Sequence, residues 1–84
     1  MYVCNVLLSK QAERDLRKVP SYIAEKFQLW IDLVENEGLR EAKKIPSFND
    51  ELLRGKRNGQ RSIRLSRAYR AIYRELKKEQ IELL

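Results

Sequence analysis

The chain has 84 residues, charged side chains make up 36% of it, and its formal net charge is +6. This length allows a single domain over residues 1–84 and excludes a multidomain enzyme. The chain has no histidine and one cysteine, Cys4, which excludes a disulfide framework, a multi-thiolate metal cage and any nucleophile paired with a histidine.

The same composition bears on location and cofactors. No apolar run approaches the roughly 20 residues of a membrane span, and the N-terminus lacks the basic and apolar regions of a signal peptide. We therefore expect a cytoplasmic protein without membrane association, a metal or a small-molecule cofactor.

The chain begins with a predicted strand. Residues 2–8 place apolar side chains at alternate positions, so we expect one face to be buried, carrying Tyr2, Cys4, Val6 and Leu8. Ser9 fits a helix N-cap, because its hydroxyl can accept from a free N–H group of the first turn. Apolar residues at helical spacing then predict a helix over Lys10–Val19.

A second helix follows Pro20, which interrupts the first. Between Ser21 and Glu37 one apolar stripe predicts the clearest amphipathic helix in the chain, made of Ile23, Phe27, Trp30, Ile31 and Val34. Gly38 is a natural C-cap. The two helices predict a hairpin that packs on a sheet, with its aromatic residues in the core rather than exposed for stacking on bases.

The middle of the chain is mixed. Leu39–Ile45 predicts a short turn of helix, and the following loop has Ile45 and Phe48 as expected anchors. The adjacent acids Asp50 and Glu51 are expected to pair with arginines rather than bind a metal.

From residue 51 onward the side-chain pattern changes to the two-residue alternation that is typical of β-strands. It predicts strands at Glu51–Arg57, Arg61–Leu65, Tyr69–Arg74 and Ile81–Leu84, separated by turns at 66–68 and 75–79. Asn58-Gly59 predicts a type I′ hairpin turn. The fold class is therefore α+β: an N-terminal strand, a two-helix hairpin, and an antiparallel meander of three to four strands.

Positive charge is concentrated in one stretch. Between Arg54 and Lys78 there are ten basic residues and one acidic residue, a net charge of +9, whereas the rest has eight basic and eleven acidic residues. Such a domain has one strongly positive surface. We expect a polyanionic partner, either nucleic acid or an acidic protein. A solvated face that keeps the domain soluble is the simpler interpretation.

Alternation predicts where the arginines lie. Ile63 and Leu65 point to one side of their strand, so Arg64 points to the other. Burying Arg64 or Arg70 would be costly, so the favoured register puts both on a common open face, together with Ile72. Guanidinium groups in one groove suit phosphodiester recognition, because each is always charged and contacts two oxygens.

The run from Leu53 to Tyr73 resembles the core pattern of the RelE/ParE toxin superfamily, and within it the RelE and HigB-like toxins. It has Leu-x-Gly at 53–55, a short hairpin, an alternating basic strand, and Tyr-Arg-x-x-Tyr at 69–73. With the preceding strand and two helices, the resemblance covers nearly the whole chain.

The resemblance implies the toxin half of a type II toxin–antitoxin pair, with a cognate antitoxin, the ribosome and mRNA as partners. Toxins of the RelE type cut mRNA in the ribosomal A site without a metal, using the RNA 2′-hydroxyl as nucleophile. The reaction needs an in-line 2′-oxygen, stabilisation of phosphate charge and a proton for the leaving oxygen.

By position, the resemblance makes Arg70 the phosphate stabiliser and Arg64 the residue that orients or activates the 2′-hydroxyl. It implies RNA-backbone contacts for the other basic residues: Arg54, Lys56, Arg57, Arg61, Arg67 and Arg74. Ser62 stands where some relatives have a basic residue.

One departure concerns the third catalytic group, which the family commonly places after the last strand. This sequence stops at Leu84, where that segment would begin. Three interpretations remain open: a truncated chain, a shortened and weakened toxin, or catalysis by Tyr69 or Tyr73, of which Tyr73 is the assigned candidate. Core packing with the hydroxyl at the rim is the alternative for both tyrosines.

The leading hypothesis is a ribosome-dependent mRNA endonuclease that inhibits translation. Its rivals are a non-enzymatic inhibitor of DNA gyrase, as in the ParE branch, and a plain nucleic-acid-binding module. A gyrase inhibitor leaves messages intact, and a binding module causes no growth arrest.

Overall fold

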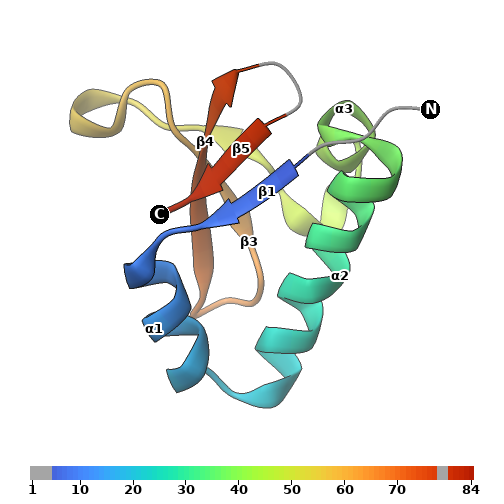
Figure 1. Ribbon diagram of the computed structural model, residues 1–84, viewed down its shortest axis with the longest axis vertical. Coiled ribbons are helices and arrows are strands. Elements are labelled where there is room, and N and C mark those ends of the chain that lie inside the picture. Colours follow the sequence, from blue (N-terminus) through green and yellow to red (C-terminus); the bar gives the residue numbers. More distant parts are fainter. Residues whose placement is uncertain (1–4, 78–79) are drawn as a thin grey trace.

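A five-stranded sheet and a layer of helices against one of its faces make up the computed structural model, which describes residues 5–77 and 80–84 (Figure 1). The helices are α1 (Lys10–Lys18), α2 (Ser21–Glu37) and α3 (Leu39–Lys43), and the strands are β1 (Asn5–Leu8), β2 (Glu51–Leu52), β3 (Arg61–Arg64), β4 (Arg70–Lys77) and β5 (Gln80–Leu83). Two short 3₁₀ turns, η1 (Pro46–Phe48) and η2 (Gly55–Arg57), flank β2. The predicted α+β class is confirmed.

The spatial order of the strands is β1-β5-β4-β3-β2. β1 runs parallel to β5, and all other neighbours are antiparallel. Parallel neighbours need a long connection, and here the three helices and the strands β2, β3 and β4 all lie between β1 and β5 in the chain. No sequence pattern identified β5 as the neighbour of β1.

Both helices form as predicted. The Ser9 hydroxyl accepts from the Ala12 N–H at 3.0 Å and caps α1. Every residue of the predicted stripe on α2 is buried, and Gly38 ends that helix with a φ of 88°, in the region that favours glycine. Phe48 is buried and Ile45 packs against the core, so both predicted anchors are confirmed.

The core lies between α2, α3 and the covered face of the sheet. Trp30 on α2 packs against Tyr73 on β4, with ring centroids 5.1 Å apart. Around this pair the sheet contributes Ile63, Ile81 and Leu83, all buried. None of the described helices combines the length and apolar character needed to cross a bilayer.

Three local predictions need correction. The strand predicted over Glu51–Arg57 ends at Leu52, because Gly55 takes a φ of 71° and the chain turns into η2. Asn58 has a φ of −54° and only Gly59 is positive, at 89°, which matches a type II turn rather than type I′. The strand predicted over Tyr69–Arg74 continues through Lys77.

The N-terminal strand also differs from prediction. Leu8 is exposed and Val6 half-buried, because β1 is the outermost strand and the helices cover it only in part. Tyr2 and Cys4 lie outside the described residues.

The Ser9 cap yields a stability prediction. Ser9→Ala removes the acceptor for the Ala12 N–H, so we expect the free energy of unfolding to fall by about 1 kcal/mol. Ser21→Ala is the matched control, because Ser21 begins α2 without a side-chain capping bond. Urea denaturation of both variants measures the difference, and equal values would contradict the capping role.

Candidate nucleic-acid interface

Two arginines lie side by side on the uncovered face of the sheet. The β3–β4 register places Arg64 directly opposite Arg70, so their side chains share one face. Ile63 and Tyr73 are completely buried on the other face. The predicted register is therefore confirmed, including the position of Ile72, which lies opposite Ser62 on the open side.

Polar neighbours hold Arg70. Its Nη1 donates to Glu51 Oε1 at 3.0 Å and to the Ser62 hydroxyl at 3.3 Å. Glu51 pairs with Ser62 across β2 and β3, so all three side chains gather on one face. A phosphate that binds Arg70 must share or replace the Glu51 carboxylate. The alternation of β3 placed Ser62 on this face, but no sequence signal showed it as a partner of Arg70.

Arg64 differs from Arg70 in having no such neighbour. Its side chain is exposed and makes no hydrogen bond or ion pair with any of the described residues. Arg74, farther along β4, instead binds Glu82 through Nε and Nη2 at 3.0 and 2.8 Å. Arg64 is therefore available to an anion without breaking an internal contact.

Tyr73 and Arg61 face away from this group. They lie opposite each other on β3 and β4, on the covered side. Both bind Asp50: the Tyr73 hydroxyl donates to Oδ2 and Arg61 Nε donates to Oδ1, each at 2.5 Å. The Asp50 carboxylate is completely buried. The assignments of Tyr73 to catalysis and Arg61 to RNA contact therefore need correction, because the structure does not bring either to the open face.

The environment of Tyr73 also opposes proton transfer. Burial raises the pKa of its hydroxyl well above the ordinary value of 10.0, and the Asp50 carboxylate raises it further. The nearby Arg61 charge acts in the opposite direction but does not offset these effects. Tyr73 therefore stays neutral, and its role is structural.

The predicted pairing of the two adjacent acids with arginines is confirmed. Asp50 binds Arg61 inside the molecule, and Glu51 binds Arg70 on its surface. No cluster of three or more potential metal-ligating side chains occurs in residues 5–77 and 80–84.

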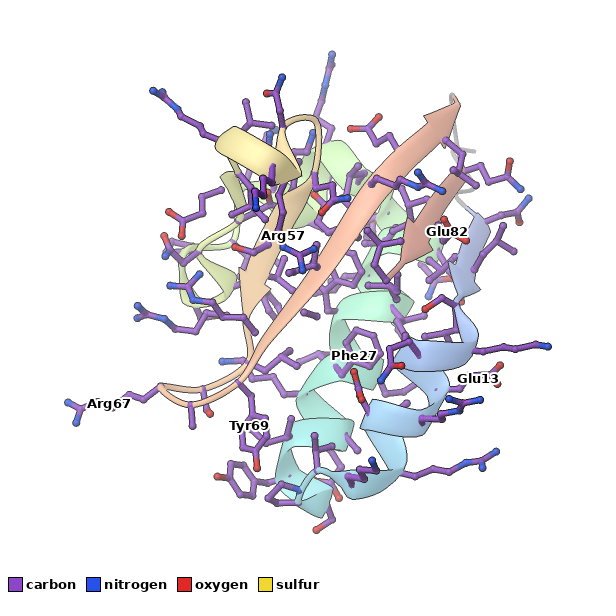
Figure 2. All side chains as sticks on the ribbon, turned by 90° about the vertical axis from the view of Figure 1, so that its left-hand side faces the viewer. Glu13, Phe27, Arg57, Arg67, Tyr69 and Glu82 are labelled. Carbon is purple, nitrogen blue, oxygen red and sulfur yellow. The ribbon has the colours of Figure 1, made fainter. Side chains whose placement is uncertain are left out.

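The remaining predicted RNA contacts lie at the two ends of β3. Arg54, Lys56 and Arg57 are exposed in and beside η2, and Arg57 donates to Gln60 at 3.0 Å. Arg67 is exposed in the turn between β3 and β4 and points away from the body of the protein (Figure 2). These cations flank the Arg64–Arg70 pair, so a polyanion lying along β3 would meet positive charge along its length.

The buried Asp50 cluster yields a stability prediction. Asp50→Ala leaves Arg61 and the Tyr73 hydroxyl without their shared acceptor, so we expect a loss of about 3–5 kcal/mol in the free energy of unfolding. Glu41→Ala breaks an exposed ion pair with Lys44 and should cost at most about 1 kcal/mol. Urea denaturation of both variants measures this, and a similar small loss in each would contradict the role of Asp50.

Tyr73 yields a pH prediction. Because its folded pKa lies above the unfolded value of 10.0, the neutral hydroxyl contributes its full stability below about pH 10 and loses it as the pH rises further. The stability advantage of the wild type over Tyr73→Phe should therefore be constant up to about pH 10 and shrink above it. Urea denaturation across this range measures the advantage; an advantage that grows with pH would contradict the assignment.

Comparison with known protein families identifies a match for nearly the whole chain. Residues 6–84 match the family described as ParE toxin of type II toxin–antitoxin system, parDE. No curated protein matches the chain significantly.

Solved toxin structures share the architecture. A chain of the YoeB–YefM complex from Staphylococcus aureus superposes with a TM-score of 0.73 at 19% identity, covering 95% of this chain and 90% of its own. A YafQ mutant from E. coli gives 0.72 at 19% identity, covering 95% and 87%. The YoeB/ParE toxin from Agrobacterium tumefaciens gives 0.63 at 20% identity, covering 95% and 92%.

The resemblance to the RelE/ParE superfamily is thus confirmed, while none of these matches is to a HigB toxin. The family match spans nearly the whole chain, and the strand, helices and antiparallel meander follow the same course as in these toxins. The chain belongs to the ParE toxin family of type II toxin–antitoxin systems.

Proposed function

We propose that this toxin is a ribosome-dependent, metal-independent mRNA endonuclease that binds its substrate on the open face of the sheet. The observation that carries this proposal is the direct pairing of Arg64 with Arg70 on that face. Two guanidinium groups on adjacent strands present several donors toward one site, and phosphate oxygens accept such donors in pairs.

The two arginines take different roles in this proposal. Arg70 is aimed by Glu51 and Ser62, so its position is set before RNA arrives, and it stabilises the charge that develops on the scissile phosphate. Arg64 has no internal partner and orients the 2′-hydroxyl toward the phosphate. Because a guanidinium does not deprotonate in proteins, Arg64 acts through its donors and charge rather than as a base.

In this proposal the surrounding cations bind the backbone of the mRNA. Arg54, Lys56 and Arg57 lie at one end of β3 and Arg67 at the other, so we assign them contacts with the RNA backbone. Arg74 is a weaker candidate for such a contact, since Glu82 already binds it through two hydrogen bonds. The partners in this proposal are the ribosome with its mRNA in the cytoplasm and a cognate antitoxin that neutralises the toxin.

A second candidate is the non-enzymatic inhibition of DNA gyrase, as in the ParE branch. Two observations favour it: the family match is to ParE toxins, and Tyr73, the residue assigned as the third catalytic group, is withdrawn into the core. In this alternative the same arginine face binds an anionic surface of the enzyme–DNA complex.

Induced expression separates the candidates. We expect the wild type to arrest growth and produce new 5′ ends in translated messages, mapped by primer extension. Arg70→Ala and Arg64→Ala should each lower cleavage by about 10²- to 10³-fold, because each removes charge stabilisation or positioning in the transition state. Arg40→Ala is the matched control, because Arg40 is exposed on α3.

The opposite outcome has a distinct signature. Growth arrest with intact messages, together with loss of supercoiling by purified gyrase, would reject the nuclease and support the second candidate. No arrest at all would leave only a nucleic-acid-binding module. Arg70→Ala that arrests growth and cuts messages as the wild type does would reject its assigned role.

A further inference from the structure

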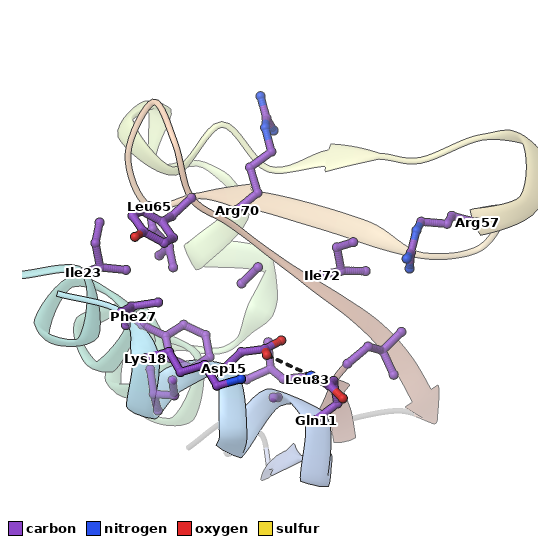
Figure 3. Close-up of a pocket in the computed structure, with 16 residues that line it drawn as sticks. Gln11, Asp15, Lys18, Ile23, Phe27, Arg57, Leu65, Arg70, Ile72 and Leu83 are labelled. Atoms are coloured by element: carbon purple, nitrogen blue, oxygen red, sulfur yellow. Dashed lines mark hydrogen bonds between the residues drawn. The ribbon is translucent and has the colours of Figure 1, made fainter.

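Helix α2 carries two apolar stripes rather than one. The buried stripe faces the sheet, and two of its members, Ile23 and Phe27, line the hollow between the helices and the sheet (Figure 3). About a third of a turn around the helix, Tyr22 and Leu29 are 62% and 55% exposed, and Leu33 on the same side is half-buried. A helix that packs on one side needs a single apolar stripe, so the second stripe requires another explanation.

The second stripe has the spacing of a helix–helix seam. Intervals of four, three, four and three residues define this outer seam, which consists of Tyr22, Lys26, Leu29, Leu33 and Asn36. Such a heptad spacing keeps one side of a helix against a neighbouring helix along its length. The Lys26 amine lies 5.4 Å from the centre of the Phe48 ring, so the one cation in the seam already contacts the protein. The outer seam therefore fits a docked helix over about two heptads.

Acidic residues border the outer seam. Helix α2 has four acidic residues and one basic residue, a net charge of −3, in a chain whose net charge is +6. Glu25 and Asp32 are exposed and flank the seam on its solvent side, whereas the other flank is formed by the buried residues Ile23 and Trp30. The Asp32 carboxylate accepts from the Gln28 amide at 2.9 Å, but neither acid forms an ion pair with a residue that the structure describes. A docked helix thus meets uncompensated negative charge along one flank.

We propose that the outer seam binds an amphipathic helix of another protein, one whose apolar stripe is flanked by lysine or arginine. Apolar side chains of that helix pack against Tyr22, Leu29 and Leu33, and its cations lie beside Glu25 and Asp32. The site is separate from the arginine pair, because α2 covers one face of the sheet (Figure 1) and the pair lies on the other. It therefore does not depend on the proposed nuclease activity.

A basic helix fits these observations better than a second copy of this chain. In an antiparallel pair of α2 helices each flank faces its own counterpart, so Glu25 and Asp32 of one copy would face the same acids of the other. In a parallel pair the acidic flank would have to face the flank of Ile23 and Trp30, which is buried in the core. Like charges brought together across an interface are destabilising, and the same charge repels a nucleic acid.

The test uses the whole 84-residue chain and two helical peptides of three heptads with leucine at every a and d position. One peptide has lysine and the other glutamate at both flanking positions, and a hydrocarbon staple on the far side keeps each helical. Measured by fluorescence anisotropy, the lysine peptide should bind at least about tenfold more tightly, because each exposed ion pair contributes modestly. NMR should show contacts between its leucines and the side chains of Tyr22 and Leu29.

Substitutions in the seam and its flank check the mode of binding. Leu29→Arg should weaken the lysine peptide by at least about tenfold, because it replaces an apolar contact with a charge. Leu52→Arg on β2 is the matched control, because Leu52 is also 55% exposed and the substitution adds the same charge. Glu25→Lys combined with Asp32→Lys should reverse the preference, so that the glutamate peptide binds more tightly. All of these side chains are exposed, and the amide spectrum of each variant verifies that it is folded.

Four outcomes would overturn the proposal. Equal affinity for the two peptides would indicate unspecific apolar capture, and no binding at about 1 mM peptide would remove this partner altogether. A dimer in sedimentation equilibrium that Leu29→Arg dissociates would assign the outer seam to a second copy of this chain. Arg64→Ala should keep the peptide affinity within about twofold even if it abolishes cleavage, and a larger change would place the peptide on the arginine face instead.

Discussion

The pairing of β3 with β4 in a single register is the constraint on which the rest of this molecule depends. A slip of one residue would turn every side chain on one strand to the other face. Ile63 would leave the core and Arg64 would enter it. The Asp50 carboxylate opposes such a slip, because it binds Arg61 on β3 and Tyr73 on β4, which face each other across the two strands. A buried acid on one side of the sheet thereby helps determine which arginines appear on the other.

The two adjacent acidic residues bind different arginines on opposite faces of the sheet. Asp50 faces inward and neutralises a cation inside the protein, whereas Glu51, the next residue, faces outward and aims Arg70. Consecutive residues of an extended chain point to opposite faces of the sheet. This dipeptide therefore places one carboxylate in the interior and the other on the open face. The result is an open face on which Arg64 has no acidic partner within the described residues, Arg70 is held, and Arg74 is bound by Glu82. A count of basic residues overstates the charge available to a partner, because several of these cations are already paired.

Local patterns predicted the elements well where one physical rule dominates. The apolar stripe on α2, the Ser9 cap and the alternation around Ile63 each follow from side-chain spacing and hydrogen-bonding capacity, and the structure confirms them. The same spacing placed Arg64 and Arg70 on one face. The type I′ prediction at Asn58-Gly59 was wrong because it assumed a strand on both sides of the turn, whereas η2 precedes the turn.

The amino-acid sequence by itself determined the order of elements, the composition of the core and the sidedness of the basic strands, because periodicity is a property of neighbours along the chain. Only the tertiary structure decided that Tyr73 lies in the core and that Arg61 is bound to a buried carboxylate. Each of these depends on contacts between residues far apart in sequence, such as Asp50 with Tyr73. Local spacing carries no information about such partners, since a tyrosine or an arginine on an alternating strand suits either face until another segment supplies or withholds its hydrogen-bond partner.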